Sequence, residues 1–176
     1  NEEIIIELDP GMAFGTGTHE STMLCLEILE KYMKKDFTVI DVGCGSGILS
    51  IACGKLGAKK VLAIDKDETA VKVATENIKR NNLDNFIKAV KGDKLQRVDF
   101  KADIIVANII ADVIIDITKD VGLYLNDGGI FISSGIIKDR KLSVIEAMEK
   151  NGLDLVQQIE KGEWVALVST QAPIGS

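Results

Sequence analysis

The chain has 176 residues, of which 46% are hydrophobic and 27% are charged. This length and balance fit one globular domain with a sizeable core, and no apolar run is long enough to span a bilayer. Lys and Arg number 21 against 27 Asp and Glu, and the formal net charge of -6 argues against a surface that binds nucleic-acid phosphates.

The three cysteines and the single histidine limit which metal and thiol chemistry the chain can support. Cys25, Cys44 and Cys53 show neither C-x-x-C spacing nor any clustering with His19. This pattern predicts buried reduced thiols, no metal site and a cytoplasmic protein.

The N-terminal stretch opens with Ile4-Ile5-Ile6, which predicts the approach to a strand. Because the chain starts at Asn1 rather than Met, we expect a fragment from which an upstream domain has been removed. At the other end, residues 171–176 are expected to form an unstructured tail.

Residues 9–20 form a Gly- and Thr-rich loop around Phe14 and His19. The loop holds more glycine and threonine than a helix cap requires, and it therefore predicts a segment that covers a ligand. A helix is expected over 21–34, with Thr18 as its N-cap, because apolar residues recur there at helical spacing.

Residues 39–50 predict a buried strand, a glycine turn and the start of a helix. Glycines at positions such as Gly43 and Gly45 let the backbone approach a ligand closely. The spacing is G-x-G-x-G, whereas the dinucleotide fingerprint G-x-G-x-x-G would place a glycine where Ile48 stands. With Asp41 in the strand, the turn resembles the first motif of the class I S-adenosylmethionine (SAM) methyltransferases.

A second apolar strand over 59–64 ends at Asp65, and a helix over 68–81 follows. An acidic residue about 20 positions beyond a glycine turn binds ribose hydroxyls in nucleotide-type cofactors, since a carboxylate accepts two donors. Asp65 is therefore predicted to bind a ribose, the alternative being a cap of the next helix. A short strand over 86–90 leads to Asp93, a candidate either for an adenine amino group or for a plain turn.

The second half of the chain continues the alternation of strands and helices. A very apolar strand over 102–108 ends at Asn108, and the core face of the next helix is expected to start at Ile110. A helix over 138–150 is expected to turn Leu142 and Met148 inward. The remaining segments are a turn over 126–129 and strands over 130–134, 153–159 and 164–169.

The order of these elements predicts an α/β fold, a doubly wound, mostly parallel seven-stranded sheet with helices on both faces. Ligands in such sheets bind beyond the carboxyl ends of the strands. Gly43, Asp65, Asp93 and Asn108 all follow predicted strands, and we expect them at this edge.

Together these motifs resemble one family, PrmA, the methyltransferases of the large-subunit ribosomal protein L-eleven. The resemblance rests on residues 9–19 (Asp-Pro-Gly-Met-Ala-Phe-Gly-Thr-Gly-Thr-His), 41–49, Asp65 and 108–111 (Asn-Ile-Ile-Ala). It implies a Rossmann-like catalytic domain over residues 1–170, preceded in the family by a substrate-recognition domain. It also implies a SAM-dependent N-methyltransferase that acts on lysine side chains or the N-terminal amine of a large-subunit ribosomal protein. By the same resemblance, the SAM-binding residues are Thr22, Gly43, Gly45, Asp65 and Asn108.

Asn108 is the expected catalytic residue. Amino-group methyltransferases of nucleic acids carry Asn or Asp here, followed by Pro-Pro and an aromatic residue. Ile109-Ile110-Ala111 lacks the aromatic that would stack on a flipped base, which favours a peptide amine. The Asn108 side-chain oxygen would accept a hydrogen bond from that amine, and the proton would be lost to water. His19 is expected to serve packing or loop hydrogen bonding rather than to act as a base.

Other functions remain open at this point. A SAM-dependent methyltransferase of another protein or of a small-molecule amine fits the same residues. A nicotinamide-dependent oxidoreductase would keep the fold, but Ile48 and the lack of a Tyr-x-x-x-Lys proton donor weigh against it. A binding module without catalysis is the third class. No direct contact with nucleic acid or a membrane is expected.

Overall fold

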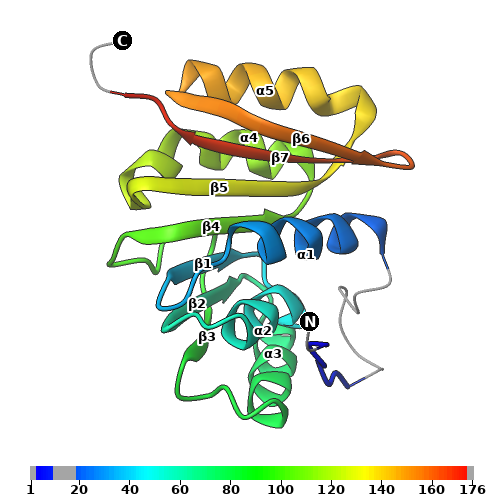
Figure 1. Ribbon diagram of the computed structural model, residues 1–176, viewed down its shortest axis with the longest axis vertical. Helices are drawn as coiled ribbons and strands as arrows, with labels where there is room; N and C mark the ends of the chain where they lie inside the picture. Colours follow the sequence, from blue (N-terminus) through cyan, green and yellow to red (C-terminus); the bar gives the residue numbers. More distant parts are fainter. Residues whose placement is uncertain (1–2, 10–18, 174–176) are drawn as a thin grey trace.

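The computed structural model describes residues 3–9 and 19–173, and within them the chain forms seven strands and five α-helices (Figure 1). The strands are β1 (Thr38–Val42), β2 (Lys60–Asp65), β3 (Ile87–Lys91), β4 (Ala102–Asn108), β5 (Leu125–Ile137), β6 (Leu153–Lys161) and β7 (Trp164–Gln171). The helices are α1 (Glu20–Tyr32), α2 (Ile48–Lys55), α3 (Glu68–Arg80), α4 (Ala111–Val121) and α5 (Lys141–Lys150).

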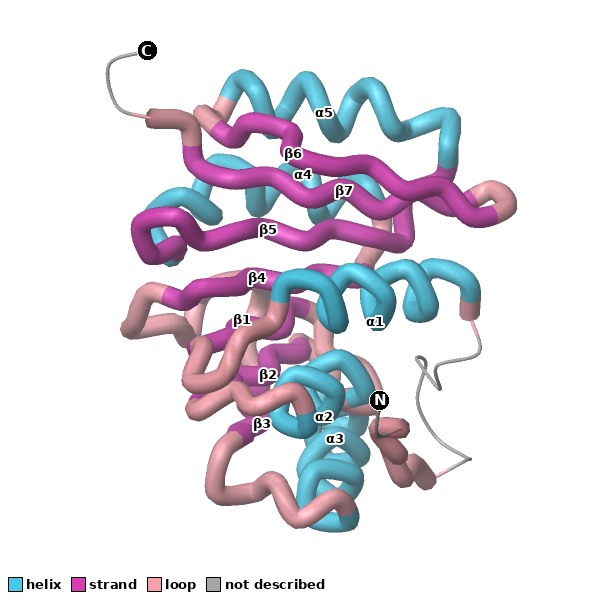
Figure 2. The backbone as a smooth tube through the Cα atoms, in the orientation of Figure 1, coloured by secondary structure: helices cyan, strands magenta, loops and turns pink. Residues whose placement is uncertain are grey.

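The strands form one sheet in the order β3-β2-β1-β4-β5-β7-β6, which Figure 2 shows as a single stack. β1 to β5 are parallel, and β7 runs antiparallel between β5 and β6. The predicted doubly wound, mostly parallel seven-stranded sheet is therefore confirmed. The order reverses between β1 and β4, so the ligand crevice of such a fold should open at the carboxyl ends of these two strands.

The helices cover both faces of the sheet, as the apolar strands require. In β4, Ile104 and Val106 pack into the cluster under α1, α2 and α3, while Ile105 and Ala107 pack into the cluster under α4 and α5. All four side chains are fully buried, which explains why this strand is an almost continuous apolar run.

Two expectations about helix faces are wrong. Leu142 was expected in the core but is 67% exposed, and Val144 and Met148 form the buried face of α5 instead. Leu142 lies two residues before Val144 in the same α-helix, about 200° around the helix axis, so the two side chains point to opposite faces. Ile110 is the N-cap of α4 and is 66% exposed, so the core face of that helix begins one residue later, at Ala111.

The turn expected at 126–129 lies inside β5. Leu125 pairs with Ala102 and Ile130 pairs with Ile104. Residues 126–129 of β5 therefore form a bulge opposite a single residue of β4, Asp103. The closing strands are also longer than expected. β7 reaches Gln171, which pairs with Leu153, and this pairing extends the sheet one residue into the expected tail.

Residues 3–9 join no described strand, in contrast to the expected approach to one. Their half-buried side chains, Ile6 and Leu8, pack against the cluster under the first three helices. Figure 1 shows this segment in dark blue beside α2 and α3. Across the described residues, no helix has the length and apolar character needed to cross a membrane.

Candidate active site

A cavity of about 680 Å³ opens at the carboxyl ends of β1 and β4, where the strand order reverses. This volume is typical of pockets for small ligands and cofactors. Thr22, Gly43, Gly45 and Asn108, four of the five predicted site residues, line it. They come from the start of α1, the glycine turn after β1 and the last residue of β4.

The glycine turn is fixed to the end of β2 by its own backbone. The N–H groups of Gly43 and Cys44 both donate to the carbonyl oxygen of Ile64, at 2.8 and 3.0 Å. Gly43 has a φ of +71°, and a Cβ added there would lie 2.5 Å from Cγ2 of Ile109. Only glycine therefore allows the turn and the segment after β4 to approach each other this closely.

Asp65 contacts this turn but does not line the cavity. Its Oδ2 accepts the N–H of Gly45 at 3.0 Å, and its Oδ1 accepts the N–H of Asp67 at 2.9 Å. The N-cap of α3 is Asp67, whose side chain accepts the N–H of Thr69. The alternative role of Asp65 as the helix cap is therefore wrong, and its carboxylate instead supports the glycine turn.

Asp41 is a site residue that the sequence reasoning left unassigned. It lies in β1, is 1% exposed and lines the cavity. Its Oδ2 accepts the hydroxyl of Ser50 at 2.7 Å, whereas its Oδ1 has no partner among the described residues. Burial raises the pKa of Asp41 to about 6, although the hydrogen bond from Ser50 opposes the rise. The sequence does carry a signal for this residue, because Asp41 is the one acidic residue in the mostly apolar strand β1.

An unpartnered buried carboxylate oxygen is costly, because a charge removed from water needs a counter-charge or a hydrogen bond. The Oδ1 of Asp41 therefore suits a ligand with a cationic or donor group, such as the ammonium of an amino acid. The methionine part of SAM carries such an ammonium. The carboxylate and the side-chain-free turn at Gly43 thus fit this cofactor.

Asn108 and Thr22 connect the end of β4 to the start of α1. The Nδ2 of Asn108 donates to Oγ1 of Thr22 at 3.1 Å. Next to this pair, the hydroxyl of Ser134 in β5 donates to the carbonyl oxygen of Ser21 at 2.9 Å. With its amide nitrogen held by Thr22, Asn108 has its Oδ1 available to accept a hydrogen bond from a ligand.

His19 is the N-cap of α1, and the expected cap, Thr18, lies outside the described residues. The Nδ1 of His19 accepts the N–H of Ser21 at 3.2 Å and lies 2.7 Å from the Ser21 hydroxyl. Its ring packs edge-on against Trp164, with 4.7 Å between centroids. The ring thus makes the packing contact and the hydrogen bond that were expected of it, and it also lines the cavity. The rest of the predicted ligand-covering loop, including Phe14, also lies outside the described residues.

Asp93 is not brought to this cavity. It follows β3 and borders a separate surface hollow together with Lys94 and Asp116. The structure therefore gives no support to a contact between Asp93 and an adenine. The three cysteines are free and buried, as predicted.

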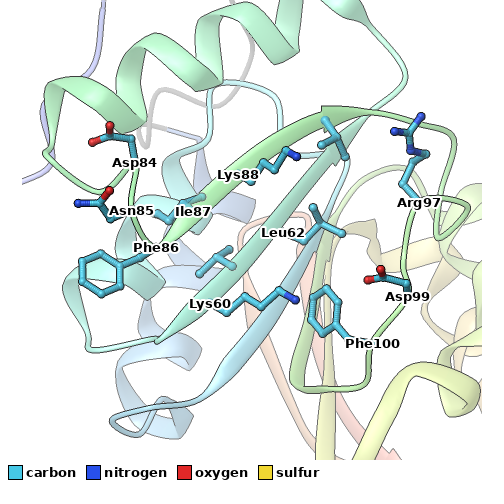
Figure 3. A pocket seen from close by; sticks show the side chains of 12 residues that line it. Lys60, Leu62, Asp84, Asn85, Phe86, Ile87, Lys88, Arg97, Asp99 and Phe100 are labelled. Atoms are coloured by element: carbon cyan, nitrogen blue, oxygen red, sulfur yellow. The ribbon is translucent and has the colours of Figure 1, made fainter.

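A further hollow of about 490 Å³ lies near the amino ends of β2 and β3 (Figure 3). Its Lys60 ammonium stands 3.9 Å from the centre of the Phe100 ring, so this cation already has a partner within the protein. The hollow lies away from the carboxyl ends of the strands, where ligands of this fold bind.

Comparison with known proteins gives a consistent result. The family model described as ribosomal protein L11 methyltransferase (PrmA) matches residues 1–172. The ribosomal protein L11 methyltransferase of Ruminiclostridium cellulolyticum is 56% identical over 169 residues, covering 95% of this chain and 54% of its own length. That of Alkaliphilus oremlandii is 53% identical over 167 residues, covering 95% and 53%. The chain thus spans about half the length of the curated relatives it matches.

Solved structures agree with the sequence relatives. The ribosomal protein L11 methylase of Lactobacillus delbrueckii subsp. bulgaricus superposes with a TM-score of 0.86 and 37% identity, covering 97% of this chain and 86% of that one. A methyltransferase from Pyrococcus furiosus has a TM-score of 0.78 at 20% identity, covering 96% and 89%, and shares the fold.

Proposed function

The chain belongs to the PrmA family of ribosomal protein L11 methyltransferases, and we propose that it is the catalytic part of a SAM-dependent N-methyltransferase. Its substrates are amino groups of ribosomal protein L11, and its location is the cytoplasm. The observation that carries the proposal is Asp41, which lines the cavity beside the glycine turn and whose buried Oδ1 has no partner among the described residues. An N-terminal substrate-recognition domain belongs to the same proposal.

Five residues would hold the cofactor, which supplies an electrophilic methyl group on its sulfonium when bound. Asp41 would balance the ammonium of the methionine part, while Gly43 and Gly45 would leave room for the methionine part along the turn. Asp65 would accept hydrogen bonds from the ribose hydroxyls, since each of its oxygens keeps accepting capacity beyond its one backbone donor. Thr22 would contact the cofactor from the start of α1.

Asn108 would hold the acceptor amine. Its Oδ1 can accept an N–H of the amine and so direct the lone pair of the nitrogen, and alignment of this kind is a major source of rate enhancement. Ile109 and the exposed Ile110 follow it at the cavity. Their apolar side chains suit the hydrocarbon stem of a lysine.

A lysine amine in water has a pKa of about 10.4 and must lose a proton before it attacks. Nδ1 of His19 is engaged by Ser21, and the Asp41 carboxylate is assigned to the ammonium of the cofactor. We therefore assign the proton to water.

Calorimetric titration of this chain with SAM, S-adenosylhomocysteine and NAD tests the cofactor. Binding of the first two with no response to NAD supports the proposal, and binding of NAD alone overturns it. Transfer of labelled methyl groups from SAM to purified ribosomal protein L11, compared with an unrelated basic protein, tests the substrate.

Replacing Asp65 by alanine should weaken SAM binding by about 10- to 100-fold, because hydrogen bonds to a charged group are lost. The matched control is Asp67→Ala, which removes the α3 cap but leaves the contact between Asp65 and Gly45 in place. Calorimetry on both variants decides the matter, and unchanged affinity in Asp65→Ala would refute the ribose role.

The affinity for SAM should rise about tenfold from about pH 5 to about pH 7, because Asp41 must be ionised to balance the ammonium. With its pKa raised to about 6, Asp41 is mostly protonated at the lower pH and releases a proton on binding. Asp41→Asn should bind weakly at every pH, with a flat profile. Ser50→Ala removes a hydrogen bond that lowers this pKa, so its profile should move to higher pH. A wild-type profile as flat as that of Asp41→Asn would contradict the assignment.

A further inference from the structure

Asn77 in α3 joins two segments that lie far apart in the sequence. Its side chain is 0% exposed. Oδ1 accepts the N–H of Asp9 at 3.0 Å, and Nδ2 donates to the carbonyl oxygen of Ser46 at 2.9 Å. Asp9 ends the described segment 3–9, and Ser46 belongs to the glycine turn that borders the cavity. One planar amide thus spans the space between the N-terminal segment and the turn.

The helix that carries Asn77 packs tightly against the same turn. A Cβ added at Gly47, next to Ser46, would lie 3.2 Å from Cβ of Ala74. Ala74 is fully buried and precedes Asn77 by three residues, which places the two on one face of the helix. A displacement of the segment at Asp9 would therefore act on the glycine turn through the Asn77 side chain. Because this side chain is buried, water cannot replace its hydrogen-bond partners.

Asn81, one helical turn further on, provides an internal comparison. Its Oδ1 accepts the N–H of Glu7 at 3.0 Å and its Nδ2 donates to the carbonyl oxygen of Glu7 at 2.7 Å. Asn81 thus holds the same segment, and within the described part of the chain the remaining hydrogen bond of its side chain goes to the carbonyl oxygen of Asn77 rather than to the glycine turn. A comparison of the two asparagines therefore distinguishes a residue that only holds the segment, Asn81, from one that holds the segment and also contacts the glycine turn, Asn77.

We propose that Asn77 is a positioning residue that couples the docking of segment 3–9 to cofactor binding at the glycine turn. The coupling rests on the proposed SAM site. Because coupling between two sites is reciprocal, the docked segment strengthens cofactor binding and the bound cofactor stabilises the docked segment. When the segment leaves α3, Oδ1 of Asn77 loses its partner, and the side chain that donates to the carbonyl oxygen of Ser46 is then held at one end only.

The test combines calorimetry with amide hydrogen exchange measured by NMR, using S-adenosylhomocysteine as the probe. In the wild type the ligand should slow exchange of the Glu7 and Asp9 amides by about tenfold, a typical size for coupling between sites. In Asn77→Ala the ligand should bind about tenfold more weakly and leave exchange of the Glu7 amide unchanged. In Asn81→Ala the segment loses its hydrogen bonds from Glu7, so affinity should also fall, but the ligand should still slow exchange of the Asp9 amide because Asn77 still joins the segment to the turn.

The outcomes separate this inference from the proposed function. If the wild type does not bind the ligand, the SAM site and the coupling both fall. If the wild type binds but the ligand leaves exchange of the Asp9 amide in Asn81→Ala as unprotected as exchange of the Glu7 amide in Asn77→Ala, Asn77 is only a structural residue and the coupling alone is overturned. Should Asn77→Ala fail to fold, the wild-type exchange experiment still decides, because a bound ligand that leaves Glu7 and Asp9 unprotected refutes the coupling.

Discussion

Replacing Asn108 by alanine should lower the rate of methyl transfer by about 100-fold or more while weakening SAM binding by only a few-fold. The side-chain oxygen is the group that would orient the acceptor amine, and alanine removes it. The cavity wall formed by the glycine turn stays intact, because the turn is fixed to Ile64 and Asp65 rather than to Asn108. Single-turnover transfer from SAM to ribosomal protein L11 gives the rate, and calorimetry gives the affinity.

The conservative variant Asn108→Asp distinguishes orientation of the amine from simple packing. Aspartate keeps an acceptor oxygen at the same position, so it should retain more activity than alanine does. Equal losses of turnover and SAM affinity in Asn108→Ala would place this residue in cofactor binding alone.

Gly43→Ala should abolish measurable SAM binding and lower the free energy of unfolding by about 2–4 kcal/mol. Alanine at a φ of +71° strains the backbone, and its Cβ would meet Cγ2 of Ile109 at 2.5 Å. Either the turn or the segment after β4 must then move, and both border the cavity. Urea denaturation and calorimetry measure the two effects.

Gly152→Ala is the matched control for this substitution. Its φ is +77° and, among the described residues, no atom beyond its chain neighbours lies within 4 Å of the added Cβ, so it reports the backbone strain alone, about 1–2 kcal/mol. The double variant Gly43→Ala/Ile109→Ala removes the colliding methyl group and should recover part of the difference. If Gly43→Ala destabilises no more than Gly152→Ala, the close packing against Ile109 is not the reason for a glycine at position 43.

Local sequence patterns predicted those parts of the fold that depend on neighbouring residues. The bounds of β4 match those of the structure, because a strand buried on both faces is apolar along its whole length. The glycine turn and its position after β1 were equally readable. Leu142 was misplaced because α5 carries apolar residues on more than one side, and only the packed structure shows that the face with Val144 and Met148 is the buried one.

The contacts that complete the site depend on the tertiary fold. Asn108 and Thr22 are separated by 86 residues, so no spacing rule indicates that the amide would donate to the hydroxyl. Asn77 is fully buried, and its partners Asp9 and Ser46 lie 68 and 31 residues away in the sequence, so no local spacing indicates these contacts. Asp41 could be noticed in its apolar strand, but its free oxygen becomes evident only once Ser50 is seen to occupy the other.

The position of β7 between β5 and β6 also determines the order in which the sheet can be completed. Among the described strands, β6 pairs only with β7. It is synthesised before β7, and it must wait for that strand to emerge before it can join the sheet. Trp164, at the start of β7, borders the cavity. A nascent chain that stops short of Trp164 would therefore hold the glycine turn and Asn108 while still lacking one wall of the cavity.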